Sequence, residues 1–322
     1  MKLFKETYSS VIILTAILIV VFVVMTIVNP ERFLSMANLQ SMAFQIPELG
    51  LFALAMFVAI LSGGINLSII GAANVAGIAG AVVLKSLMHG HGGVVLAIVA
   101  SIAVILAVSL LVGLINGFLI GYAGVSAILA TLATMTVLTG LSITITKGGA
   151  ISGFPKPFLF IGNGDIFGVP MPFIIFIICA AVVALALRKS RLGFNMYMIG
   201  SNERATLFSG INNSVVLLKV YLLSGFLSGL AALVMVSRFN SAKASYGLSY
   251  LLLSVLVVLL GGASAYGGTG NVLGIVVALF LMQLFSSSFN LMGFSTFLTT
   301  AIWGMVLVFV MMVRGFMGSR EG

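Results

Sequence analysis

The sequence predicts an all-α membrane protein that crosses the bilayer many times. Of its 322 residues, 61% are hydrophobic and only 7% are charged, and the mean hydropathy is +1.29. A soluble domain carries about a quarter charged residues, so this chain has too few for a water-facing surface. Several apolar runs also approach the roughly 20 residues that a helix needs to cross a bilayer. These features exclude a compact soluble enzyme and predict one transmembrane domain over residues 1–322.

Ten apolar segments follow one another along the chain, so we expect about ten transmembrane helices. Asn29-Pro30 ends the first segment, because the residue before proline is pushed out of helical geometry. No small-residue cleavage signal follows this segment, which favours a first membrane helix over a cleaved signal peptide. The glycines and prolines between 148 and 157 predict a long irregular loop. The expected spans are 11–29, 44–62, 66–86, 93–121, 125–146, 170–188, 214–236, 249–263, 270–288 and 291–313.

The basic residues predict the orientation of these spans. The chain has 15 Lys and Arg against 6 Asp and Glu, and the basic residues lie mostly between apolar runs. Such charges orient helices in a membrane, so the net charge of +9 does not indicate nucleic-acid binding. Ten spans place both termini on one side. The cluster Arg188, Lys189 and Arg191 assigns that side to the cytoplasm.

A short helix outside the membrane is expected over residues 201–210, within the segment 189–213. Ser201 is a favourable helix cap, Glu203 would lie in the first turn, and Gly210 is a natural stop. At helical geometry this gives about two to three turns. One interpretation is an interfacial amphipathic connector. The other is a docking element for a cytoplasmic partner.

Ionisable groups at membrane depth are few. Glu48 lies near the outer end of the second expected span, and a lone intramembrane carboxylate is a candidate for a substrate pathway. The alternative interpretation, which we favour, is an interfacial residue that caps a helix just after Pro47. His89 and His91 lie in an outer turn, so a chain of groups for proton transfer is not expected. The sequence also predicts no catalytic constellation, no metal site and no phosphate-binding lysine motif.

Two groups of small polar residues are candidates for a substrate pathway. Residues 62–68 begin a span with two glycines followed by Asn66 and Ser68. This pattern fits either a broken helix near a substrate path or a tight turn between two spans. Thr131 and Thr134 lie three residues apart on one helix face. They would line a polar pathway or form hydrogen bonds between helices.

Four segments together resemble the ribose-type permease subunits of bacterial ABC importers, which are related to branched-chain amino-acid permeases. The resemblance runs from about residue 35 to the C-terminus, with the segments in order and at fitting spacing. Two departures are Asn66, where the family has an acidic residue, and Ser126-Ala127-Ile128, where it often has Pro-Pro-Phe. The four segments are 62–68 (SGGINLS), 130–154 (ATLATMTVLTGLSITITKGGAISGF), 199–211 (IGSNERATLFSGI) and 261–274 (GGASAYGGTGNVLG).

The resemblance implies a type II-like importer permease in the bacterial inner membrane. Two permease copies or paralogues would form the pathway, an external solute-binding protein would deliver a small neutral solute such as a monosaccharide, and cytoplasmic ATPase subunits would hydrolyse ATP. Because ATP hydrolysis belongs to partners, the chain itself would be neither an enzyme nor a cofactor-binding protein. A stand-alone secondary transporter or facilitator is the alternative. The residues implied in ATPase coupling are Ser201, Asn202, Glu203, Arg204, Ser209 and Gly210.

Overall fold

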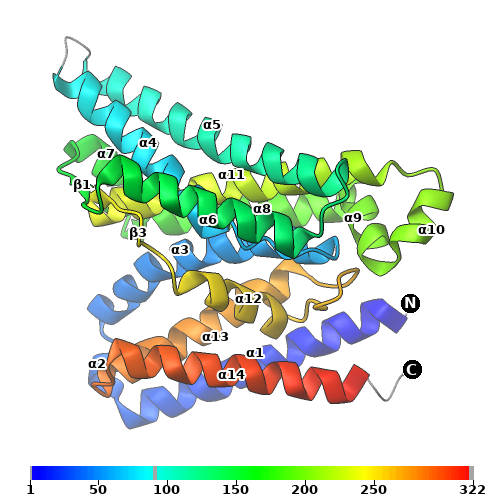
Figure 1. The fold of residues 1–322 in the computed structure, drawn as a ribbon. Helices are drawn as coiled ribbons and strands as arrows, with labels where there is room; N and C mark the ends of the chain where they lie inside the picture. The colour runs from blue at the N-terminus through cyan, green and yellow to red at the C-terminus, as the bar shows by residue number, and fades with distance from the viewer. Residues whose placement is uncertain (1, 90–92, 319–322) are drawn as a thin grey trace.

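The computed structural model describes residues 2–89 and 93–318 as a bundle of long helices that run roughly side by side (Figure 1). Most of the outer turn predicted around His89 and His91 therefore lies outside the described residues. The helices are α1 (Lys2–Val28), α2 (Pro30–Phe33), α3 (Met36–Leu61), α4 (Ile69–His89), α5 (Val94–Gly121), α6 (Ala127–Thr146), α7 (Lys156–Asn163), α8 (Met171–Lys189), α9 (Arg191–Ser201), α10 (Glu203–Phe208), α11 (Asn213–Phe239), α12 (Tyr250–Leu260), α13 (Val272–Leu291) and α14 (Thr296–Gly318). The strands are β1 (Ile151–Ser152), β2 (Asp165–Ile166), β3 (Val169–Pro170) and β4 (Ser241–Ala242).

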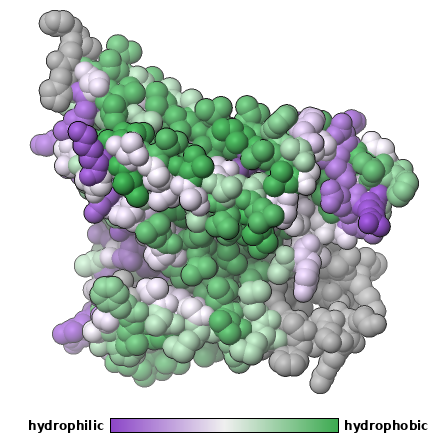
Figure 2. Space-filling view, viewed as in Figure 1, coloured by the Kyte–Doolittle hydropathy of each residue, from purple (hydrophilic) through white to green (hydrophobic). Residues whose placement is uncertain are grey.

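Within the described residues, eight helices are long and apolar enough to cross a membrane. Figure 2 shows hydrophobic side chains across the middle of the molecule and hydrophilic ones gathered at its two ends. This distribution suits a chain whose middle faces lipid, since lipid-facing residues must be apolar. The prediction of an all-α polytopic membrane protein is confirmed.

The two ends of the bundle differ. The start of α1, the end of α14 and the whole of α10 lie at one end, which we call the α10 end (Figure 1). The helix α7 and the strands β1 to β4 belong to the opposite end, which we call the α7 end (Figure 1). The two chain termini and the short helix predicted outside the membrane therefore share one side of the protein.

Helix α3 forms the centre of the bundle. Its residues Leu51–Leu61 are at most 1% exposed, and the helix packs against α8, α11, α12 and α13. A helix that is apolar on every face must be surrounded by other helices. Ser35 caps α3 by accepting a hydrogen bond from the Asn38 backbone N–H at 3.2 Å. This cap starts the helix eight residues before the predicted start at 44.

Two segments differ from the sequence prediction. Residues 148–170 are not one irregular loop, because they contain α7, β1 and a β2–β3 hairpin in which Asp165 pairs with Pro170. The expected span 249–263 contains only the 11-residue helix α12. At 1.5 Å per residue this helix is about 17 Å long, too short for a hydrocarbon core of about 30 Å. The chain is non-helical on both sides of α12, between β4 and Tyr250 and between Leu260 and the start of α13.

Glycines allow α5 and α11 to pack closely. A Cβ atom at Gly113 would lie 2.5 Å from the Tyr221 carbonyl oxygen, and one at Gly225 would lie 2.5 Å from the Ser109 carbonyl oxygen. Such separations leave no room for a larger side chain. This is the small-residue packing typical of membrane helices, where close backbone approach replaces the hydrophobic effect.

We expect Gly225→Val to destabilise the protein by about 1–3 kcal/mol, because it forces the α5 and α11 backbones apart. The matched control is Gly140→Val on α6, where an added Cβ would meet nothing within 4 Å. Thermal unfolding of both variants in the same detergent measures the effect. Equal melting temperatures for the two variants would contradict this packing.

Candidate functional site

The candidate site is a buried polar network around Asn66, in the non-helical segment between α3 and α4. Asn66 Nδ2 donates to Ser224 Oγ at 2.9 Å, and Ser224 Oγ donates to the Ala55 carbonyl oxygen at 2.8 Å. Ser224 lies near the middle of α11, about 16 Å from its start at 1.5 Å per residue. Asn66 therefore lies at membrane depth, and it joins the 62–68 segment to α11 and α3.

The network continues from Asn66 to α5 and α6. Ser68 Oγ donates to Asn66 Oδ1 at 2.8 Å and accepts from Asn116 Nδ2 at 2.7 Å. Thr134 Oγ1 on α6 donates to Asn116 Oδ1 at 2.7 Å. The chain of hydrogen bonds thus runs from α3 through α11 and the 62–68 segment to α5 and α6.

Thr131 satisfies the backbone of the same segment. Its Oγ1 accepts from the Leu67 N–H at 3.1 Å and lies 3.1 Å from the Ile65 carbonyl oxygen, to which it can donate. In a bilayer, non-helical backbone is stable only where protein or water covers its polar groups. The structure thus brings four of the five pathway candidates, Asn66, Ser68, Thr131 and Thr134, into one network. Sequence reasoning missed Asn116 and Ser224, which stood alone in apolar runs.

Glu48 lies apart from this network. It is in the middle of α3 rather than at an outer helix end, because α3 starts early and continues through Pro47. Its side chain is 0% exposed, its Oε1 lies 3.2 Å from Arg238 Nη1, and its Oε2 accepts from Tyr250 Oη at 2.8 Å. The interpretation of Glu48 as an interfacial helix cap is therefore wrong. The side chain links α3 to α11 and α12.

The predicted helix at 201–210 is split between two helices. Ser201 is the last residue of α9, and its hydroxyl donates to the Tyr197 carbonyl oxygen at 2.9 Å, so the prediction that it caps the next helix is wrong. Asn202 is the cap, because its extended backbone lets Oδ1 accept from the Ala205 N–H at 2.9 Å. The helix α10 ends at Phe208, with Ser209 as its C-cap. The predicted stop, Gly210, follows with φ +76°.

Helix α10 presents large apolar side chains to its surroundings. Phe208 is 90% exposed and Leu207 is 63% exposed, whereas Thr206 is buried. Glu203 and Arg204 are also exposed, and the Glu203 carbonyl oxygen accepts from Asn213 Nδ2 at 2.9 Å, which ties α10 to α11. In Figure 2 hydrophilic and hydrophobic residues lie side by side around α9 and α10. Sequence reasoning selected the charged residues and missed Leu207 and Phe208, whose exposure only the fold reveals.

Three of the four motif segments meet at the α10 end. The Gly268 N–H donates to the Leu61 carbonyl oxygen at 3.0 Å. A Cβ atom at Gly267 would lie 2.7 Å from Gly63 N and 3.0 Å from Gly200 Cα. The glycines are thus required by backbone contact between 62–68, α9 and 261–274. The fourth segment joins them through Thr131.

Tyr197 locks this contact from α9. Its Oη donates to the Gly270 carbonyl oxygen at 2.9 Å. Burial raises the pKa of the Tyr197 phenol above its ordinary value. The phenol therefore keeps its proton, and this hydrogen bond persists across the physiological pH range.

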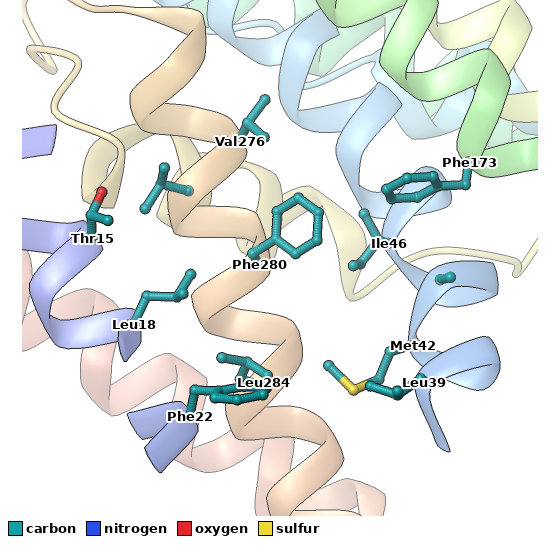
Figure 3. A pocket seen from close by; sticks show the side chains of 12 residues that line it. Thr15, Leu18, Phe22, Leu39, Met42, Ile46, Phe173, Val276, Phe280 and Leu284 are labelled. Atoms are coloured by element: carbon teal, nitrogen blue, oxygen red, sulfur yellow. The ribbon is translucent and has the colours of Figure 1, made fainter. Parts of the chain in front are cut away.

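Among the cavities between the described helices, two differ sharply in character. The larger, of about 500 Å³, lies between α1, α3, α8 and α13 and is lined by apolar side chains such as Phe280 and Ile46 (Figure 3). Its one hydroxyl, that of Thr15, donates to the Val11 carbonyl oxygen at 2.7 Å. This lining suits hydrocarbon and not a polar solute. The smaller cavity, of about 240 Å³, lies at the α10 end and has both polar and apolar residues in its walls.

The fold and the buried polar network are those of a polytopic membrane protein with a polar interior. The family model described as "Branched-chain amino acid transport system / permease component" matches residues 38–313. The chain therefore belongs to this family. No solved structure matches it significantly.

Curated relatives cover nearly the whole chain. A ribose import permease protein of Bacillus subtilis (strain 168) is 35% identical over 300 residues, 92% of this chain and 90% of the relative. A ribose import permease protein of Haemophilus influenzae is 32% identical over 94% of this chain and 93% of the relative. An autoinducer 2 import system permease protein of Escherichia coli (strain K12) is 32% identical over 98% of this chain and 94% of the relative.

We expect Glu48→Ala to destabilise the protein by about 3–5 kcal/mol, because it leaves the Arg238 guanidinium without its partner. Removing both charges in Glu48→Ala/Arg238→Ala should cost less than the sum of the two single changes. The exposed acid Glu31 provides the control, and Glu31→Ala should change little. The measurement is the free energy of unfolding, in detergent, of the unaltered chain, the two single variants, the double variant and the control. The first four form a double-mutant cycle. Strict additivity would mean that the ion pair does not couple α3 to α11.

Proposed function

We propose that this chain is the permease subunit of an ABC importer for a small neutral solute, most simply a monosaccharide. The family match over residues 38–313 carries the proposal. The relatives' names place them in import systems for ribose and for autoinducer 2. The buried polar groups of the network are amides and hydroxyls, which suit a neutral polyhydroxylated solute, and the Glu48 charge is neutralised by Arg238.

The α10 end is the proposed cytoplasmic side. Arg188 and Lys189 lie in the last turn of α8, immediately before α9 and α10. Basic residues next to a membrane span favour the cytoplasmic side. Both chain termini belong to this end (Figure 1). The α7 end then faces an external solute-binding protein.

Helix α10 is the proposed docking element for a cytoplasmic ATPase subunit. Asn213 of α11 donates a hydrogen bond to the Glu203 carbonyl oxygen and so fixes the start of α10. Phe208 is 90% exposed and Leu207 is 63% exposed, and large apolar side chains of this kind commonly anchor protein interfaces. Glu203 and Arg204 would supply polar contacts at the rim. ATP hydrolysis then takes place in the partner, and motion of α10 reaches the 62–68 segment through the glycine contacts of α9. A second permease copy or paralogue completes the pathway.

The decisive experiment is co-expression of the chain with its neighbouring genes, followed by purification in mild detergent and mass analysis. We expect an ATPase subunit to co-purify, and the complex in liposomes to take up a neutral monosaccharide only with ATP and a solute-binding protein. If the purified chain came alone and carried solute without ATP, it would be a facilitator and the proposal would be wrong.

We expect Phe208→Asp to lower the amount of co-purified ATPase more than tenfold, since loss of an interface anchor costs about 2 kcal/mol or more. The double change Glu203→Ala/Arg204→Ala should have a smaller effect, because rim contacts contribute less. Phe167→Asp at the fully exposed tip of the β2–β3 hairpin is the matched control, and it should leave ATPase recovery unchanged. Normal recovery with Phe208→Asp would exclude α10 as the main docking element.

A further inference from the structure

The smaller cavity, at the α10 end, combines polar and apolar walls, as binding sites for small molecules do. Its volume of about 240 Å³ lies below the roughly 300–1,000 Å³ of pockets for drug-sized ligands, which suits a smaller solute. It runs from an exposed mouth at Glu203 and Gly63 to an inner wall formed by Tyr221. It lies within one copy of the chain, between α10, the 62–68 segment, the α5–α6 connection and α11.

A buried hydroxyl on the inner wall has no partner. Tyr221 is 0% exposed, and within the described part of the chain its Oη has no hydrogen-bond partner. This oxygen lies beside Gly64, where an added Cβ would be 2.5 Å from it. Gly64 also lines the cavity. An unsatisfied buried hydroxyl costs about 1–3 kcal/mol, so a ligand that paired with it would recover that cost.

The N-terminus of α6 provides further donors. Ser126 and Ala127 line the cavity, and no side-chain hydrogen bond caps this 20-residue helix. The first N–H groups of a helix have no hydrogen-bond partner within the helix, and they point outward from its N-terminal end. Beside Tyr221, they give the cavity several donors for ligand oxygens.

Glu203 supplies the opposite character at the mouth. Glu203 is exposed and is the charged residue among those that line the cavity, so its negative charge disfavours an anion that the α6 terminus would otherwise attract. A ligand that satisfies both walls must carry several donors and several acceptors in a small volume, without a negative charge. We propose that this cavity binds a neutral polyhydroxylated solute of monosaccharide size.

Because this ligand class is that of the proposed function, the site rests on that function. It is nevertheless distinct from the network around Asn66, since the network residues do not line the cavity. On the proposed topology the mouth opens to the cytoplasm beside α10. A bound solute would touch both α10 and the α6 terminus, so solute on the cytoplasmic side would act on the ATPase-docking helix.

Equilibrium dialysis of the full-length chain in nanodiscs, with radiolabelled D-ribose and D-glucose as probes, tests the site. We expect saturable binding of at least one sugar, and Tyr221→Phe should weaken it about fivefold to tenfold, the effect of one hydrogen bond to a neutral group. Because the hydroxyl has no partner, this change should leave thermal stability intact. Tyr266→Phe removes a 90% exposed hydroxyl and should bind as the unaltered chain does.

A second variant fills the cavity from its exposed side. Val125→Trp adds bulk at an exposed lining position and should abolish binding. Equal binding by the Tyr221→Phe and Tyr266→Phe chains would overturn the site. Absence of saturable binding to a chain whose complex shows ATP-driven sugar uptake would also overturn it and leave the proposed function standing. Absence of uptake with binding that depends on Tyr221 would instead refute the function and support the cavity.

Discussion

The arrangement of the bundle depends on satisfying the backbone of residues 62–68 at membrane depth. The Ser62, Gly63 and Gly64 N–H groups still bond to carbonyl oxygens of α3, and the Ser68 carbonyl oxygen accepts from the Ala72 N–H of α4. The Leu67 N–H between them has no helical partner, and such a group in a bilayer must be satisfied by protein or water. Thr131 supplies the partner for the Leu67 N–H, Asn66 anchors the segment to Ser224 of α11, and Ser68 anchors it to Asn116 of α5. Helices α3, α5, α6 and α11 must therefore stay in contact around it. A shift of α6 would leave the Leu67 N–H without its partner, and a shift of α5 or α11 would break the side-chain bonds of Ser68 or Asn66.

The side-chain hydrogen bonds of residues 62–68 do not place this segment beside α9 and the 261–274 loop. The contact there is made by backbone atoms of glycines, with the Gly268 N–H bonded to the Leu61 carbonyl oxygen. Side chains at Gly200, Gly267 or Gly268 would prevent it. Rigid backbone contact transmits displacement better than flexible side chains, because a close-packed interior has little compressibility. The path from α10 to the polar network is thus short and stiff.

An ion pair adds to the glycine contact between α7 and α11, where a Cβ atom at Gly162 would lie 2.7 Å from Arg238 Cα. Arg238, at the end of α11, approaches Glu48 and also donates to the Phe44 carbonyl oxygen at 2.9 Å. Tyr250 fixes the second carboxylate oxygen and thereby holds the short helix α12. One buried carboxylate therefore organises three helices. Its substitution would disturb a helix that is too short to be stable across a bilayer alone.

The sequence by itself determined the class of protein, most helix positions and the motif segments, because hydropathy and local turn chemistry depend on neighbouring residues. It also identified Asn66, Ser68, Thr131 and Thr134 as candidate residues of a substrate pathway. Only the tertiary structure decided that they bond to Asn116 and Ser224, that Glu48 faces Arg238, and that Phe208 is exposed on α10. Asn66 and Ser224 are 158 residues apart, and Glu48 and Tyr250 are 202 apart. Such contacts are set by helix packing, which local sequence patterns do not encode.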